Sequence, residues 1–171
     1  LRLFEPVKPM LADTAPDLVT ALRAHHGRTA FEYKLDGARV QIHKQNEHIE
    51  IFSRRLAKIT LSLPELVELV RNKVKADEAI LEGEVVAVDK AGRPMPFQEL
   101  MRRFRRIADV QEAVRRVPVR LYLFDVLYLE GRPMLELAQN QRRRILEESC
   151  PQELLTPTLV TDNEEEARVF F

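Results

Sequence analysis

Lys34, Asp36, Gly37 and Arg39 lie within one short string, Lys-Leu-Asp-Gly-Ala-Arg. An amine is nucleophilic only when neutral, whereas the pKa of an ordinary lysine is about 10.4. Partial burial or a neighbouring positive charge favours the neutral form, and Arg39 could supply that charge. Arg39 could also grip a phosphate through its rigid fork of donors. Since Asp36-Gly37 is a turn dipeptide, the string suits a lysine nucleophile beside a phosphate clamp.

A second group of chemistry-bearing residues interrupts the apolar run 79–89, which reads Ala-Ile-Leu-Glu-Gly-Glu-Val-Val-Ala-Val-Asp. Carboxylates are costly to bury unless they are paired or bind a ligand, and glycine within a strand often marks close backbone approach. Glu82 and Glu84 therefore indicate a site more strongly than a solvated strand edge.

Four strings in order resemble a known family. Lys-x-Asp-Gly-x-Arg resembles motif I of the covalent nucleotidyl transferases, which include DNA ligases, RNA ligases and mRNA capping enzymes. The strings Phe-Ser-Arg-Arg, Glu-Gly-Glu and Leu-Phe-Asp-Val follow at residues 52–55, 82–84 and 123–126. The flanking Glu-Tyr-Lys and Gln-Ile-His look most like ATP-dependent DNA ligases of the archaeal and eukaryotic replicative type, and their bacterial relatives.

The resemblance implies that Lys34 attacks the α-phosphate of ATP, with Mg²⁺, to form an AMP-lysine intermediate. It implies that Glu84 contacts the ribose or the metal, and that Phe124 stacks on the purine, although an aromatic residue in such an apolar run is more often core. Glu82 stands where aspartate is common, which leaves its role open. The nucleotide-binding residues implied are Glu32, Arg39, Arg54, Glu84 and Phe124.

The periodicity of apolar residues predicts an α+β protein. Helices are expected over 17–26, 63–74, 97–106 and within 133–150, and strands over 31–34, 39–43, 48–52, 79–89, 117–129 and 158–161. We expect the first three strands to be successive antiparallel neighbours, the first two joined by the Asp-Gly turn. Asp162 or Asn163 is expected to cap a final acidic helix. The resemblance implies two antiparallel sheets packed with helices, in an ATP-grasp-like ligase nucleotidyltransferase fold with the nucleotide between the sheets.

Composition describes a globular chain of 171 residues, with 45% hydrophobic and 32% charged residues and a formal net charge of zero. A neutral chain is not as a whole an electrostatic surface for nucleic acid. The lone Cys150 excludes an internal disulfide framework, and four scattered histidines offer no zinc-ligand spacing. No run has the roughly 18 apolar residues of a membrane helix. We expect a monomer in the cytoplasm or nucleoid, or in the nucleus if the source is eukaryotic.

Seven arginines against two acids lie between Met101 and Arg120. This cluster is either a solvated face or a surface that binds the phosphates of duplex DNA. With nicked duplex DNA as the partner that the resemblance implies, the candidate DNA contacts are Arg54, Arg102, Arg103, Arg105 and Arg106.

The family's later motifs, its C-terminal OB-fold and its N-terminal DNA-binding domain are not in the sequence, so residues 1–171 are expected to be a partial adenylation domain, truncated at its C-terminal side. In the full-length enzyme AMP would pass to a DNA 5′-phosphate and the nick would be sealed; we expect the fragment to do this poorly. Two alternatives remain. One is another nucleotidyltransferase, either an RNA ligase or a capping-type enzyme that uses GTP, and the other is a non-catalytic nucleic-acid-binding module.

Overall fold

A computed structural model describes residues 1–104 and 109–170. The chain forms two compact units, each built from two separate segments. The large unit comprises Leu1–Lys8 and Leu35–Leu155, and the small unit comprises Pro9–Lys34 and Thr156–Phe171. We describe each unit separately.

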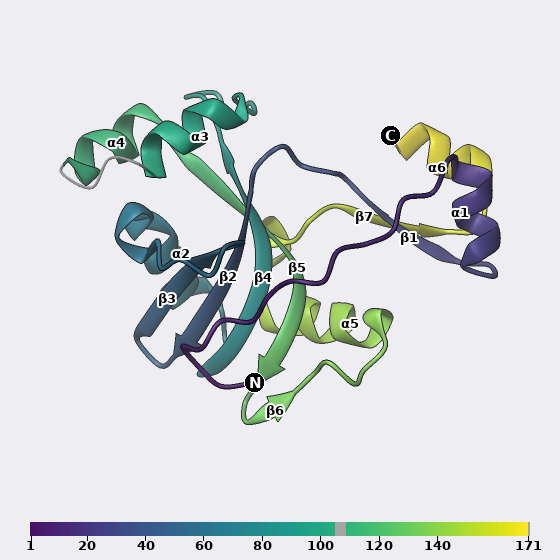
Figure 1. Ribbon diagram of the computed structural model, residues 1–171, viewed down its shortest axis with the longest axis horizontal. Helices are drawn as coiled ribbons and strands as arrows, with labels where there is room; N and C mark the ends of the chain where they lie inside the picture. Colours follow the sequence, from purple (N-terminus) through teal and green to yellow (C-terminus); the bar gives the residue numbers. More distant parts are fainter. Residues whose placement is uncertain (105–108, 171) are drawn as a thin grey trace. The chain divides into compact units, whose positions relative to one another are not determined.

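The large unit is built on an antiparallel five-stranded sheet of order β3-β2-β4-β5-β6 (Figure 1). Its strands are β2 (Ala38–Gln45), β3 (His48–Ser53), β4 (Glu78–Ala87), β5 (Val119–Leu129) and β6 (Arg132–Pro133). β4 is the central strand and pairs with β2 on one side and β5 on the other. The strands that carry Arg39, Glu84 and Phe124 therefore lie side by side, with β4 in the middle.

Helices of the large unit cover this sheet. They are η1 (Thr60–Ser62), α2 (Pro64–Lys73), α3 (Phe97–Phe104), α4 (Val110–Arg116), α5 (Gln139–Ser149) and η2 (Gln152–Leu154). α2 begins with proline at its first turn, where a missing N–H costs nothing, and buries Leu66 and Val70, which are four residues apart. α4 was not predicted. In the described part of the chain, no helix has the length and apolar character needed to cross a membrane.

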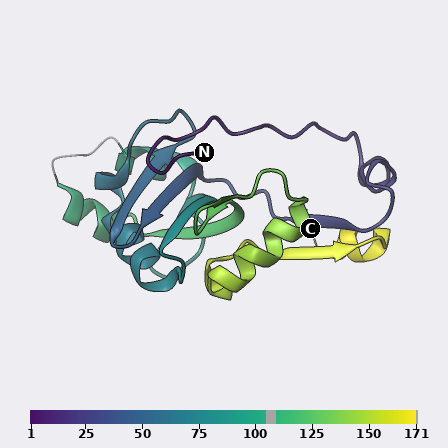
Figure 2. The same cartoon turned by 90° about the horizontal axis from the view of Figure 1, so that it is seen from below.

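Side chains alternate along β2 between the core and a polar face. Val40 and Ile42 are fully buried in the hydrophobic core, together with Leu81 of β4 and Leu123 of β5. The residues that alternate with Val40 and Ile42 along the strand are Arg39, Gln41 and His43. They point to the opposite face, because successive residues of a strand alternate between its two faces. The first residues of the chain contact this polar face through hydrogen bonds to Gln41 and His43 (Figure 2).

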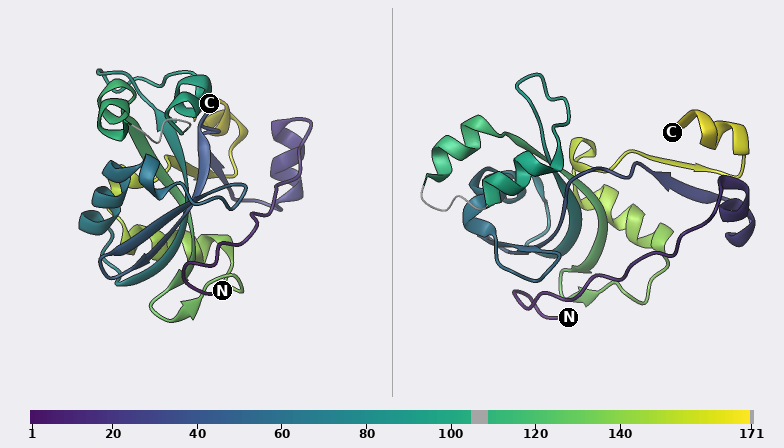
Figure 3. Two further views of the ribbon diagram at one scale, coloured as in Figure 1. Left: turned by 60° about the vertical axis from the view of Figure 1, so that its left-hand side comes forward. Right: turned by 45° about the horizontal axis from the view of Figure 1, so that its top comes forward.

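The small unit contains a two-stranded sheet and two helices. β1 (Thr29–Glu32) pairs antiparallel with β7 (Thr158–Thr161), and α1 (Leu18–Ala24) lies beside α6 (Glu164–Phe170) (Figure 3). The Asn163 side chain accepts hydrogen bonds from the backbone N–H groups of Glu165 and Glu166, so Asn163 is the cap of α6.

Local features mark both ends of α1. Asp17 Oδ1 accepts a hydrogen bond of 2.7 Å from the Thr20 N–H. This bond to the ionised form lowers the pKa of Asp17 from its ordinary value. The helix ends before Gly27, which has a positive φ of 131°.

The expected hairpin between residues 31–34 and 39–43 is wrong. β1 pairs with β7, more than a hundred residues further along the chain, whereas both edges of β2 are occupied by β3 and β4. Asp36-Gly37 is therefore part of a connection between the two units and not a tight turn between paired strands. Local alternation predicts that a strand exists, but the choice of its partner depends on contacts distant in sequence.

Candidate nucleotide-binding site

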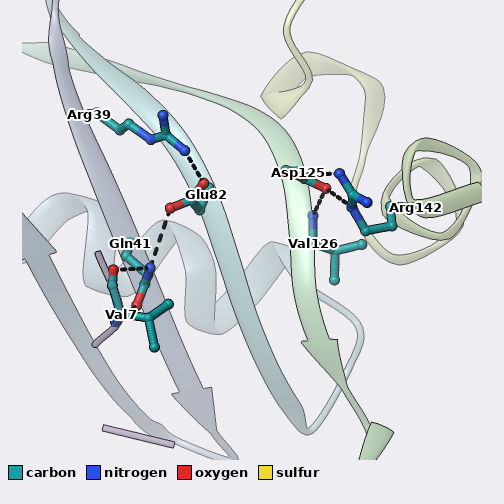
Figure 4. Close-up of polar contacts among 7 residues, drawn as sticks. All are labelled: Val7, Arg39, Gln41, Glu82, Asp125, Val126 and Arg142. Carbon is teal, nitrogen blue, oxygen red and sulfur yellow. Dashed lines mark hydrogen bonds and ion pairs between the residues drawn. The ribbon is translucent and has the colours of Figure 1, made fainter. Parts of the chain in front are cut away.

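Arg39 lies at the centre of the site on the polar face of the large sheet. Its guanidinium forms an ion pair with the Glu82 carboxylate (Figure 4). The same guanidinium lies over the Phe124 ring, 5.3 Å from the ring centroid. A cation at this distance from an aromatic face is attracted by the ring quadrupole. The Arg39 side chain thus joins residues from three strands. The sequence left the role of Glu82 open, and the structure shows that Glu82 is the ion-pair partner of Arg39.

A β-bulge places Phe124 in this cluster. On β4, Glu82 pairs with Asp125 and the next residue, Gly83, pairs with Leu123, so Phe124 has no partner across the strand pair. A bulge adds a residue to one strand and changes the direction of its side chain. Phe124 is half-buried and lies on the same face as Tyr122, while Leu121 and Leu123 are buried; this alternation breaks at the next residue, Asp125, which is also half-buried.

Two glycines allow the strands to approach closely at this point. A Cβ atom on Gly83 would lie 2.7 Å from the Tyr122 carbonyl oxygen, and one on Gly37 would lie 2.3 Å from the Val85 carbonyl oxygen. Both distances are too short for any side chain. Gly37 therefore holds the segment after Lys34 against β4, and Gly83 holds β5 against β4 beside Phe124.

Glu84 and Arg54 lie at the same end of the sheet as Arg39. Glu84 is half-buried and is the direct partner of Arg39 in the register of β4 and β2. Val40 pairs with Ser53, the last residue of β3, and the exposed Arg54 follows in the turn after that strand. The Glu84 carboxylate is therefore the cross-strand neighbour of Arg39, and Arg54 lies just beyond the same end of the sheet.

Lys34 and Glu32 belong to the small unit. Lys34 is exposed and follows the end of β1, and its neighbour Tyr33 stacks on Phe170 with ring centroids 4.6 Å apart. Glu32 is the last residue of β1 and its carboxylate accepts a hydrogen bond of 3.1 Å from the Thr158 hydroxyl. Their roles in catalysis and nucleotide binding stay predictions.

A partly buried ion pair supports the strand segment that carries Phe124. Arg142 of α5 donates to both carboxylate oxygens of Asp125, at 2.8 and 2.9 Å, and to the Leu137 carbonyl oxygen at 2.7 Å (Figure 4). These bonds to Asp125 raise the pKa of Arg142 above its ordinary value. Asp125 also accepts a hydrogen bond of 2.9 Å from the Val126 N–H.

Arg103 corrects the prediction of DNA contacts. Its side chain is only 1% exposed and donates to the carbonyl oxygens of Ser62 and Val117 while pairing with Glu65. An arginine with these partners inside the core is not available to a phosphate. Its place three residues after the buried Leu100 is the sequence signal for this orientation. Arg102 is exposed and pairs with Glu99, whereas Arg105 and Arg106 lie outside the described residues.

Sequence reasoning assigned no role to Gln41 or His43, which were noted only as part of the Gln-Ile-His string. Gln41 and His43 are buried polar residues on the face that carries Arg39. A signal for Arg142 was present, because an aspartate within the apolar run of β5 needs a cationic or hydrogen-bonding partner.

The described residues contain no group of three His, Cys, Asp or Glu side chains placed to hold a metal ion. Mg²⁺ is usually bound by one or two carboxylates together with substrate phosphates and water. Glu84, a half-buried carboxylate opposite Arg39 in the strand register, fits that manner of binding.

Comparison with known proteins identifies the family of this chain. Residues 9–171 match the family described as ATP dependent DNA ligase domain. The chain belongs to this ligase family. A DNA ligase of Thermococcus fumicolans is 44% identical over 174 residues, covering 100% of this chain and 31% of the relative. DNA ligase 2 of Methanosarcina acetivorans is 48% identical over 150 residues, covering 88% of this chain and 26% of the relative.

The resemblance to ATP-dependent DNA ligases is therefore confirmed. This chain spans about a third or less of the length of these relatives. A solved structure, mycobacterial DNA ligase D complexed with ATP and MES, superposes with a TM-score of 0.61 at 22% identity, covering 85% of this chain and 44% of that one. At that identity the likeness shows the fold alone. It confirms an α+β ligase-domain fold with two antiparallel sheets.

Proposed function

We propose that this ligase domain forms a covalent lysine–AMP intermediate as the first step of ATP-dependent DNA ligation. The observation that carries the proposal is the contact of Arg39 with both Glu82 and Phe124, next to Glu84, in a chain of this family. A guanidinium for phosphate, a flat ring for a purine and a carboxylate for a ribose or metal are the groups that a bound ATP requires.

In the proposed reaction the neutral Lys34 amine attacks the α-phosphorus of ATP. A nitrogen–phosphorus bond forms, the bond between the α-phosphorus and the bridging oxygen of pyrophosphate breaks, and the amine loses a proton. Arg39 and Arg54 orient the phosphates and neutralise their charge, which is the main protein contribution to phosphoryl transfer. Mg²⁺, when bound at Glu84 and the phosphates, would draw charge from the leaving pyrophosphate.

Labelled ATP tests this function. Incubation with ATP labelled at the α-phosphate and Mg²⁺ should label the protein covalently, and Lys34→Ala should abolish the label. Lys73→Ala is the matched control, because Lys73 is an exposed lysine of the large unit that pairs with Glu153. Labelling that persists in Lys34→Ala, or that requires GTP in place of ATP, would contradict the proposal; a GTP requirement would favour the capping-type alternative.

We infer that nicked duplex DNA is the partner and that Arg54 and Arg102 contact its phosphates. Both side chains are exposed, unlike Arg103. Arg102→Ala should weaken DNA binding and reduce the dependence of affinity on salt without changing stability. Arg103→Met should instead destabilise the fold, because the Ser62 and Val117 carbonyl oxygens and the Glu65 carboxylate would lose their buried donor. An equal effect of the two changes on DNA affinity in folded protein would contradict this division.

A further inference from the structure

A chain of buried polar contacts connects the first residues of the protein with Arg39. The Val7 N–H donates to Gln41 Oε1 at 3.0 Å, and Gln41 Nε2 donates to the Val7 carbonyl oxygen at 3.2 Å and to Glu82 Oε1 at 3.3 Å. The other carboxylate oxygen of Glu82 pairs with Arg39 (Figure 4). The Gln41 amide therefore bridges residues 4–7, which we name the arm, and the carboxylate that holds Arg39. All of these residues belong to the large unit.

His43 determines the orientation of the Gln41 amide. The Phe4 N–H donates to His43 Nδ1 at 2.8 Å, so Nδ1 is an acceptor and the proton lies on Nε2. Nε2–H then donates to Gln41 Oε1 at 2.9 Å. Because Oε1 accepts from both His43 and Val7, the amide nitrogen of Gln41 must face Glu82. Burial lowers the pKa of His43 to about 4, although the opposing charge of Glu50 raises it, so this neutral tautomer persists near pH 7.

Burial makes this chain of contacts rigid. Gln41 and Glu82 are each 4% exposed and His43 is fully buried. A buried polar group without its partner carries a desolvation cost, so the amide, the imidazole and the carboxylate have few alternative arrangements. If the arm leaves the sheet, His43 loses the Phe4 donor and Gln41 loses both of its bonds to Val7. The constraints on the orientation of Glu82 then weaken, and those on Arg39 weaken with them.

We propose that Gln41 and His43 are positioning residues, which couple the docking of the arm on β2 to the orientation of the Arg39 guanidinium over Phe124. The coupling itself rests on the contacts within the large unit. Its consequence for ATP rests on the proposed function of Arg39 as a phosphate-binding residue. Coupling of this kind is reciprocal: a change at Arg39 must alter the docking of the arm, and a change in the arm must alter Arg39.

NMR-detected hydrogen exchange of the Phe4 and Val7 amides tests this coupling in the full chain. Arg39→Lys removes the planar fork that matches the Glu82 carboxylate, and it should accelerate exchange of both amides by about 5-fold or more. In a Gln41→Glu background, which keeps an acceptor for Val7 but removes the donor to Glu82, the same Arg39→Lys change should have no further effect on these amides. Exchange at Phe4 and Val7 that is indifferent to Arg39→Lys would overturn the proposal.

Gln45→Glu is the matched control. Gln45 lies on the same strand and also donates to a glutamate of β4, Glu78 Oε1 at 3.0 Å, but it is exposed and distant from the arm in the strand register. In this background Arg39→Lys should retain its full effect on the Phe4 and Val7 amides. Loss of the effect in both backgrounds would show that strand β2 is destabilised in general, and it would also overturn the proposal.

A second measurement separates this inference from the proposed function. Addition of ATP and Mg²⁺ should change exchange of the Phe4 and Val7 amides in the parent protein but not in Gln41→Glu. If Arg39→Lys changes arm exchange and ATP neither binds nor labels the protein, the coupling stands and the proposed function fails. If ATP binds and labels the protein while the arm amides respond to neither change, the coupling fails and the proposed function stands.

Discussion

Arg39 makes two contacts, and a bound nucleotide would compete with Arg39 for one of them, the Phe124 ring. It is paired with Glu82 and lies over Phe124, the residue that we propose as the platform for the purine. A cation–π contact contributes about 0.5–1 kcal/mol at an exposed site, a magnitude similar to or smaller than that of base stacking, about 1–3 kcal/mol. Binding of a nucleotide can therefore replace the contact with Phe124 while the ion pair with Glu82 is kept.

Phe124→Leu should weaken ATP binding by about 5- to 150-fold, which corresponds to about 1–3 kcal/mol of lost stacking. Leucine preserves the apolar volume but has no flat face. Phe124→Tyr keeps the ring and is the control, with affinity close to that of the parent. Isothermal titration calorimetry with ATP measures the difference. Equal affinities of the leucine and tyrosine variants would show that the ring does not stack on the base.

The buried His43 should make stability depend on pH. Its pKa is about 4 in the folded protein, below the ordinary 6.5, so the unfolded chain binds the proton first as the pH falls. The free energy of unfolding should consequently decrease between pH 6.5 and pH 4, by up to about 3 kcal/mol. Urea unfolding across this range measures the decrease.

His43→Leu should remove this part of the pH dependence, whereas His48→Leu should retain it because the His48 side chain is exposed. Glu50, which opposes His43 across β2 and β3, is present in both variants. A pH dependence of the His43→Leu protein that matches the parent would assign the effect to other groups.

Gly37→Ala should destabilise the protein more than Gly131→Ala. The Cβ atom at position 37 would lie 2.3 Å from the Val85 carbonyl oxygen, and only a backbone shift could relieve that clash. At position 131 no atom lies within 4 Å, and the cost is confined to the positive φ of 80°, which is about 1–2 kcal/mol for a residue with a Cβ. Urea midpoints of the two variants compare them directly; a larger loss at position 131 would contradict the close approach of residue 37 to β4.

Strand β5 depends on helix α5 for the placement of its bulge. The Asp125–Arg142 pair has side chains 19% and 17% exposed, and it ties the residue after Phe124 to α5. Hydrogen-bonded pairs at this degree of burial are coupled more strongly than surface pairs, because removing one partner leaves the other poorly solvated.

A double-mutant cycle with Asp125→Asn and Arg142→Gln should give a coupling energy of about 1–3 kcal/mol in urea unfolding. The Lys73–Glu153 pair of the same unit is the control, since both of its side chains are at least half exposed. Its coupling should be below about 1 kcal/mol. Equal coupling in the two cycles would mean that the Asp125–Arg142 pair does not hold the bulge in place.

The division of the chain into two units has consequences for local stability. β1 and β7 pair only with each other, whereas β4 is covered by a strand on both sides. Two-stranded sheets are marginally stable by themselves, and the small unit buries few apolar side chains. It nevertheless carries Lys34, the proposed nucleophile.

Amides of Ala30–Phe31 should therefore exchange faster with solvent than amides of Val40–Ile42 in the parent protein. Local unfolding of a small, sparsely packed unit requires less free energy than unfolding of the large sheet. Hydrogen–deuterium exchange with mass spectrometry resolves the two regions in one experiment. Equal protection would show that the two units unfold as one.

Much of the fold could be predicted from local pattern. The apolar spacing of α2, the strands β2, β3, β4 and β5, and the acidic helix capped by Asn163 all follow from side-chain periodicity and capping chemistry, which act over a few residues. The candidate site was also visible in part, because a Glu-Gly-Glu string within an apolar strand is costly without partners.

The sequence by itself determined the family and the type and approximate position of most strands and helices, since these depend on residue type and local spacing. It also supplied the candidate site residues, whose roles stay predictions. Only the tertiary structure decided that β1 pairs with β7, that Phe124 lies on a bulge, that Arg103 is buried, and that Glu82 holds Arg39. Each of these four outcomes is a pairing between residues distant along the chain. Such pairings are selected by burial and by the satisfaction of buried polar groups in the folded molecule, which no local pattern specifies.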